Sequence, residues 1–130
     1  MIQITNMELV EAYQALHKIG EHQGCDPVAA LKAARNKRIL LPFVETRDEA
    51  VQKLLKECTV CQEDGDVKRD EMGNVMFKSE EAKQKWTEGF QNINRALVEV
   101  EICAFREEEL KMLQATPNEM YGLLPLVGNL

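Results

Sequence analysis

The side chains with the clearest capacity for chemistry form two closely spaced pairs, His22 with Cys25 and Cys58 with Cys61. Two residues separate the members of each pair, a gap that lets both reach one metal ion, and three thiolates with one imidazole can hold zinc tetrahedrally. The pattern is only half of a double CxxC motif, and each cysteine also suits an ordinary apolar or loop position. We therefore expect no metal and no cofactor, and we keep zinc binding by this set as an alternative.

Other reactive side chains lack the partners that catalysis needs. The Cys58–Cys61 pair follows an expected helix instead of opening one, so the helix dipole does not favour a thiolate there. His17 has no nearby serine or cysteine motif, which indicates an ordinary surface histidine. The acidic runs at 63–66 and 107–109 lack the spacing of a calcium loop, so we interpret both as solvated surface. These patterns predict a protein that is not an enzyme.

A basic island stands out in a chain whose net charge is −6. Lys32, Arg35, Lys37 and Arg38 fall within seven positions, and on a helix three of them, without Lys37, share an arc of about 120°. Val28, Leu31 and Ile39 lie on the same arc. Arginine supplies bidentate hydrogen bonds and the aliphatic residues exclude water, so this surface suits a partner. The predicted partner-binding or anion-binding residues are Lys32, Arg35, Arg38 and Ile39.

The same island has an internal explanation. Glu80, Glu81 or Glu88 on an opposing helix could neutralise these cations within the chain, and the sequence leaves both readings open. The partner reading allows either a host protein or a small anionic ligand. Broad binding to duplex nucleic acid is not expected, because it requires many cations and the remainder of the chain is acidic.

The length of 130 residues and the hydrophobic content of 45% fit one domain over residues 1–130. No run of about 18 apolar residues occurs, so we expect no membrane span. The start of the chain lacks the basic and apolar regions of a secretory signal, which favours a cytoplasmic protein with reduced cysteines.

The elements that must position these residues form an α+β fold, mainly α. Alternation in 2–5 and 98–104 predicts two short strands that pair near the termini. Between them we expect a first helix capped by Asn6, a long helix from about Pro27 that is kinked near Pro42, and a helix opening at 79–81. Apolar residues at helical spacing extend that third helix to Leu97 and Val100. The two long helices should form an antiparallel hairpin with a small β-hairpin-like tip, and a short helix should follow Thr116 and Pro117.

Several segments in this order resemble small accessory proteins of uncharacterised function that bacteriophages and prophages encode. The resembling segments are "IQITNMELVEAYQAL", "AARNKRILLPFVETRDEAVQKLLKEC", "EDGD", "VEVEI" and "LLPLV". The resemblance implies a viral accessory protein located in the host cytoplasm, and it carries over no active site.

Three functions remain after these exclusions. The first is a non-catalytic phage protein that binds and inhibits or sequesters a host defence component through its helical, partly basic surface. The second is a virion-assembly or tail-associated structural protein, and the third is a small zinc-binding or thiol protein. Long amphipathic helices also predict self-association as a homodimer, because they carry more apolar surface than one partner helix buries.

Overall fold

The computed structural model describes residues 1–63, 65 and 67–128. The chain divides into two compact units, one of Met1–Glu45 with Leu97–Leu130 and one of Thr46–Ala96. The long helix α2, Pro27–Cys58, belongs to both. The expected α+β, mainly helical fold is confirmed. Within the described ranges, no helix is both long enough and apolar enough to cross a membrane.

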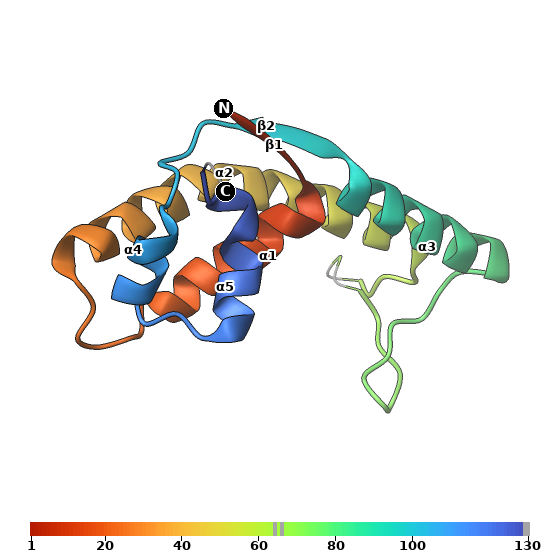
Figure 1. Cartoon of the computed structure of the whole chain (residues 1–130). Helices are drawn as coiled ribbons and strands as arrows, with labels where there is room; N and C mark the ends of the chain where they lie inside the picture. Colours follow the sequence, from red (N-terminus) through yellow and green to blue (C-terminus); the bar gives the residue numbers. More distant parts are fainter. Residues whose placement is uncertain (64, 66, 129–130) are drawn as a thin grey trace. The chain divides into compact units, whose positions relative to one another are not determined.

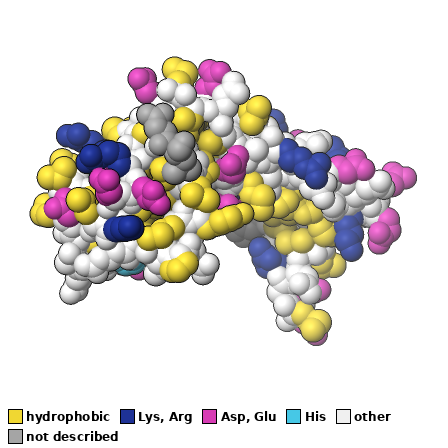
Figure 2. All heavy atoms as spheres, viewed as in Figure 1, with side chains coloured by type: hydrophobic (Ala, Val, Ile, Leu, Met, Phe, Trp, Pro, Cys, Tyr) yellow, Lys and Arg dark blue, Asp and Glu magenta, His cyan; other side chains and the backbone are white. Residues whose placement is uncertain are grey.

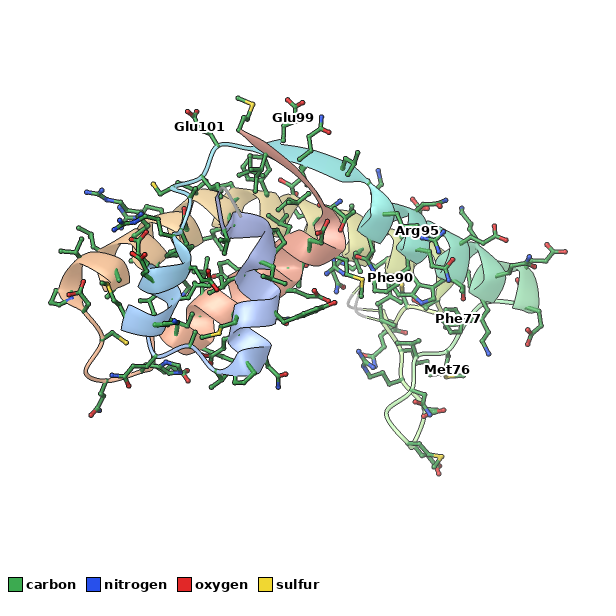
Figure 3. The ribbon with its side chains drawn as sticks, in the orientation of Figure 1. Met76, Phe77, Phe90, Arg95, Glu99 and Glu101 are labelled. Atoms are coloured by element: carbon green, nitrogen blue, oxygen red, sulfur yellow. The ribbon has the colours of Figure 1, made fainter. Side chains whose placement is uncertain are left out.

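The two-stranded base of the first unit is confirmed. Strand β1, Ile2–Thr5, pairs antiparallel with β2, Leu97–Val100, and Ile2 lies opposite Val100 (Figure 1). Glu99 accepts a hydrogen bond from the Gln3 side chain at 3.0 Å, and Glu99 and Glu101 point outward (Figure 3). The second strand was expected over 98–104, but it spans Leu97–Val100. Val100 pairs with Ile2, the first residue of β1, and beyond β2 Phe105 forms an isolated parallel bridge with Val127.

Helix α1, Asn6–Ile19, begins one residue earlier than the sequence predicted. Thr5 is its N-cap, since the hydroxyl accepts from the Glu8 N–H at 3.1 Å and the Glu8 carboxylate accepts from the Thr5 N–H at 3.0 Å. This reciprocal capping box satisfies two backbone donors, whereas the expected Asn6 cap satisfies one. The box fixes the turn from β1 directly into α1.

Three short elements close the first unit: α4, Glu107–Met112; α5, Pro117–Leu123; and the 3₁₀ turn η1, Leu124–Leu126. The predicted start of α5 is confirmed, with Thr116 as N-cap and proline at the first position. Helix α5 packs on α1, where a Cβ on Gly122 would lie 3.1 Å from the Glu11 carbonyl oxygen (Figure 1). The core of this unit includes Leu9, Leu16, Leu40, Val100, Phe105, Leu113, Leu123 and Leu126.

Helix α2 runs continuously through Pro42, as the single-helix interpretation predicted. Proline removes one backbone hydrogen bond inside a helix and costs about 3 kcal/mol in a free helix. Buried neighbours on either side, Leu40 and Val44, anchor the helix here, while Pro42 itself is exposed. Packing of the adjacent turns thus holds the helix together across the proline.

The second unit contains the antiparallel helix pair. Arg47 donates to Asn94 at 2.9 Å, Leu54 lies against Gly89, and Lys85 lies 3.7 Å from Glu57. Residue numbers rise along α2 as they fall along α3, Glu80–Arg95, so the two helices run in opposite directions. The predicted antiparallel hairpin is confirmed.

Helix α3 ends earlier than the apolar spacing predicted. It stops at Arg95, and Leu97 is a strand residue with 65% of its surface exposed. The helical stripe is therefore limited to Trp86, Phe90 and Ile93. Trp86 stacks on Phe90 with ring centroids 5.1 Å apart. The pairing of β2 with β1 overrides the helical period at Leu97, because strand pairing satisfies both backbones.

The tip between α2 and α3 is a set of isolated antiparallel bridges. Thr59 pairs with Phe77, Cys61 with Val67, and Arg69 with Val75. Phe77 and Met76 come from this segment and Phe90 comes from α3 (Figure 3). The small β-hairpin-like tip is thus present in its simplest form. Asp64 and Asp66, part of the acidic run discussed above, lie outside the described residues.

Candidate interaction surface on α2

The basic island occupies the first turns of α2, in the first unit. Asp26 accepts from the Ala29 N–H at 3.1 Å and Pro27 opens the helix, as predicted. The buried side of this stretch consists of Ala29, Ala33, Asn36, Leu40 and Val44, which recur every three or four residues. This stripe fixes which side chains of the island point away from the core.

Lys32 is partly buried and forms an ion pair with Glu109 of the same unit. Its Nζ lies 2.8 Å from Glu109 Oε1 and 3.2 Å from the Ala104 carbonyl oxygen. Glu109 is 4% exposed and also accepts from the Arg106 N–H at 2.9 Å. The interpretation of residues 107–109 as solvated surface was therefore wrong for Glu109. The internal partner of Lys32 is Glu109, not Glu80, Glu81 or Glu88.

The hydrogen bond from Lys32 lowers the pKa of the Glu109 carboxyl below its usual value. Burial acts in the opposite direction and raises this pKa, while the backbone N–H of Arg106, the charge of Lys32 and the Arg106 side chain lower it further. The carboxylate therefore stays ionised when buried. Lys32 and Glu109 together attach α4 to α2 and are committed to the fold.

Ile39 and Lys37 also make internal contacts. Ile39 is partly buried and packs against the core of the first unit. Lys37 lies off the predicted arc, with its Nζ 2.9 Å from His17 Nδ1 and 5.8 Å from the centre of the Tyr13 ring. Of the four predicted binding residues, Lys32 and Ile39 therefore contribute mainly to the fold.

Arg35 and Arg38 are the members of the island that remain available. Both are exposed, and neither forms an ion pair or a side-chain hydrogen bond with the part of the chain that the structure describes. Val28 and Leu31 on the same side are 72% and 52% exposed. Lys and Arg side chains gather over this part of α2 beside hydrophobic ones (Figure 2). We call the surface of Val28, Leu31, Arg35 and Arg38 the Arg35/Arg38 face.

The two halves of the proposed zinc set make separate contacts. His22 Nδ1 and Cys25 Sγ lie 3.3 and 3.2 Å from the Leu113 carbonyl oxygen, and His22 Nε2 lies 3.3 Å from Glu119. These residues belong to the first unit, whereas Cys58, which is buried, and Cys61, which is exposed, belong to the second. Over residues 1–63, 65 and 67–128, no group of three or more His, Cys, Asp or Glu side chains is placed to hold a metal ion.

Asn36 is a key residue that the sequence analysis did not identify. Its side chain is fully buried, its Nδ2 donates to the Cys103 carbonyl oxygen at 2.8 Å, and its Oδ1 accepts from the Cys103 N–H at 2.8 Å. One amide thus replaces a strand partner for the chain just after β2. The sequence does contain a signal for this role. Asn36 lies three residues after Ala33 and four before Leu40, so it is a polar residue on the apolar side of the helix.

Comparison of the chain with protein-family models, with curated proteins and with solved structures finds no match.

Proposed function

We propose that this chain is a non-catalytic, phage-encoded binding protein that engages a host defence component and inhibits or sequesters it. The single observation that carries the binding role is the Arg35/Arg38 face. Arg35 and Arg38, which have no acceptor among the residues that the structure describes, stand beside two exposed aliphatic side chains on one helix. Arginine beside apolar surface is the composition that protein interfaces favour.

The geometry favours a protein partner over a small anion. Binding of a single small anion by this helix requires Lys32, Arg35 and Arg38 to contact the same anion, but Lys32 is paired with Glu109 at 2.8 Å. The remaining two arginines are three positions apart on an open helical surface with aliphatic neighbours. Such a surface gains most by burying Val28 and Leu31 together with the arginines, which a small anion cannot do.

The phage origin and the host target rest on the resemblance of segments such as "VEVEI" and "LLPLV" to phage accessory proteins. A stoichiometric inhibitor of this kind works by occupying a surface and needs no catalytic group. The predicted homodimer is a separate property, and light scattering over a range of concentrations measures it directly.

Quantitative affinity capture from phage-infected and uninfected host cells tests the proposal. Tagged wild-type chain, the Arg35→Glu/Arg38→Glu double variant and a Lys53→Glu/Lys56→Glu control are compared by mass spectrometry. The control lies on the same helix, with the same spacing and charge change, and both lysines are exposed. We expect one host protein enriched by the wild type and the control but reduced at least tenfold with the double variant.

The enriched protein is then purified and titrated with the same three chains. Binding that ranks them in the same order, and loss of the host protein's activity upon addition of the wild type, support the proposal. Enrichment that is equal for all three chains, or recovery only of virion proteins, contradicts it.

A further inference from the structure

The Arg35/Arg38 face has the residue spacing of a helix-packing seam. Its members Val28, Leu31, Arg35 and Arg38 are separated by three, four and three residues, the alternation at which one helix packs along another. The four side chains form one stripe that extends about 15 Å along α2 at a rise of about 1.5 Å per residue. The face is therefore ordered along a line and is not a diffuse charged patch.

The period of this stripe matches a partner helix better than a partner strand. Successive members lie about 5 Å apart along the axis, close to the pitch of about 5.4 Å of an α-helix. Side chains on one face of a strand repeat at about 6.6 Å, so a strand loses alignment with the stripe after two contacts. An occupant that contacts all four positions is expected to be helical.

The charges of the face argue against a second copy of this chain as its occupant. A parallel two-fold pair places Arg35 against Arg35 of the other copy, and an antiparallel pair centred between the arginines places Arg35 against Arg38. In either arrangement cations face cations, which destabilises the contact. An antiparallel pair that aligns all four positions instead places Arg35 against Leu31 and Arg38 against Val28, so both guanidinium groups are buried against aliphatic side chains that offer them no acceptor. Glutamate or aspartate at the facing positions instead gives charge-assisted hydrogen bonds to both guanidinium groups.

We infer that the Arg35/Arg38 face docks an amphipathic helix of the partner protein, with apolar residues against Val28 and Leu31 and carboxylates against Arg35 and Arg38. This inference rests on the proposed function and adds the secondary structure and charge pattern of the recognised segment. Pairing of two helices works in this way, with contacts three and four residues apart on one side of each helix.

Fluorescence anisotropy with three labelled synthetic helices tests the inference on the full chain. The first peptide carries Leu and Glu at the spacing complementary to the face, the second replaces each of these Glu residues by Lys, and the third rearranges the first into a two-residue alternation. Each is titrated with the wild type, Arg35→Glu/Arg38→Glu, Leu31→Asp and the Lys53→Glu/Lys56→Glu control. All the substituted positions are exposed, so the variants are expected to fold.

We expect the wild type and the control to bind the Glu helix about tenfold more tightly than the Lys helix, and the double arginine variant to reverse this preference. Leu31→Asp should weaken binding of the Glu helix without reversing the preference. The inference would be overturned if the wild type bound the Glu and Lys helices with equal affinity. It would also be overturned if the wild type bound the rearranged peptide as tightly as the Glu helix. If the wild type binds a 20-nucleotide duplex more tightly than the Glu helix, the inference is also overturned. Self-association of the chain that Leu31→Asp abolishes would overturn it as well.

The peptide titration and the host-cell capture can fail separately. Arginine-dependent capture of a host protein without the peptide preference means that the face is a binding site for something other than an acidic helix. Loss of arginine dependence in both experiments means that the proposed function itself is wrong.

Discussion

Replacing Asn36 tests how the first unit holds the chain after β2. The side chain is fully buried and makes two hydrogen bonds of 2.8 Å to the backbone of Cys103. In the Asn36→Leu variant both bonds are lost and the Cys103 N–H and C=O lose their protein partner. Two net hydrogen bonds and the partial desolvation of two backbone groups predict a loss of about 2–4 kcal/mol in the free energy of unfolding.

Urea denaturation followed by circular dichroism measures this loss, with Arg38→Leu on the exposed side of the same helix as the matched control. The control should change the free energy of unfolding by less than about 0.5 kcal/mol. At about 4 °C per kcal/mol, Asn36→Leu should lower Tm by about 8–16 °C. Equal stability of the two variants would refute the role assigned to Asn36.

The Asn36→Asp variant sharpens the test because it keeps the size of the side chain. One carboxylate oxygen can still accept from the Cys103 N–H, but the other then faces the Cys103 carbonyl oxygen, which is also an acceptor. Protonation restores a donor at that position. The stability deficit of Asn36→Asp relative to the wild type should therefore shrink as the pH falls, and a deficit that is independent of pH would contradict the geometry.

Three further predictions concern other contacts of the fold. The pKa of Glu109 is lower in the folded chain than its ordinary value of 4.5, so its stabilising contribution is complete above pH 4.5 and is lost as the pH falls through the folded-state pKa. Glu109→Gln should flatten this part of the pH dependence of the free energy of unfolding, which urea titrations between about pH 3 and 7 measure. Gly122→Ala places a Cβ 3.1 Å from the Glu11 carbonyl oxygen and 3.2 Å from the Ala15 Cβ, so it should destabilise the chain by about 1–3 kcal/mol in thermal unfolding. The loss should exceed that of Gly89→Ala, whose Cβ would lie 2.6 Å from the Leu54 Cδ2 but meets there the end of a flexible side chain that can turn aside. Arg35→Glu/Arg38→Glu should change the free energy of unfolding by no more than about 1 kcal/mol, because both side chains are exposed; a larger loss in urea denaturation would show that they stabilise the fold.

Several elements of the fold follow from local signals in the sequence. Thr116 with Pro117 marks the start of α5, and Asp26 with Pro27 marks the start of α2. The alternation in 2–5 identifies β1, and the pairing of β1 with β2 follows from the need of two short strands for a partner. These signals succeed because capping and alternation depend on residues that are close in sequence.

The errors arise where contacts between distant residues decide the outcome. Glu109 is buried because Lys32, 77 residues away, reaches it, and no local pattern distinguishes it from Glu107 or Glu108. Leu97 continues a helical stripe in the sequence, yet strand pairing with Thr5 places it in β2. The helix α4 has no strong start signal, since its N-cap Arg106 makes no side-chain capping bond of the usual serine or threonine kind.

The candidate site is predicted in part for the same reason. Helical periodicity places Lys32, Arg35 and Arg38 on one arc, but it does not say which of the three finds an internal carboxylate. The structure separates them, with Lys32 at 2.8 Å from Glu109 and the two arginines exposed. Which of the three cations remains available for binding is therefore decided by tertiary contacts, which helical periodicity does not contain.

Site-specific photo-crosslinking in the host cell tests the central claim most directly. A photoreactive amino acid replaces Leu31, which is 52% exposed in the middle of the Arg35/Arg38 face, and a second chain carries it at Lys53 as the control. The proposal predicts a discrete adduct with one host protein at position 31 that disappears when Arg35→Glu/Arg38→Glu is added. An adduct whose mass equals two copies of this chain, or an adduct that forms at position 53 and not at position 31, would contradict it.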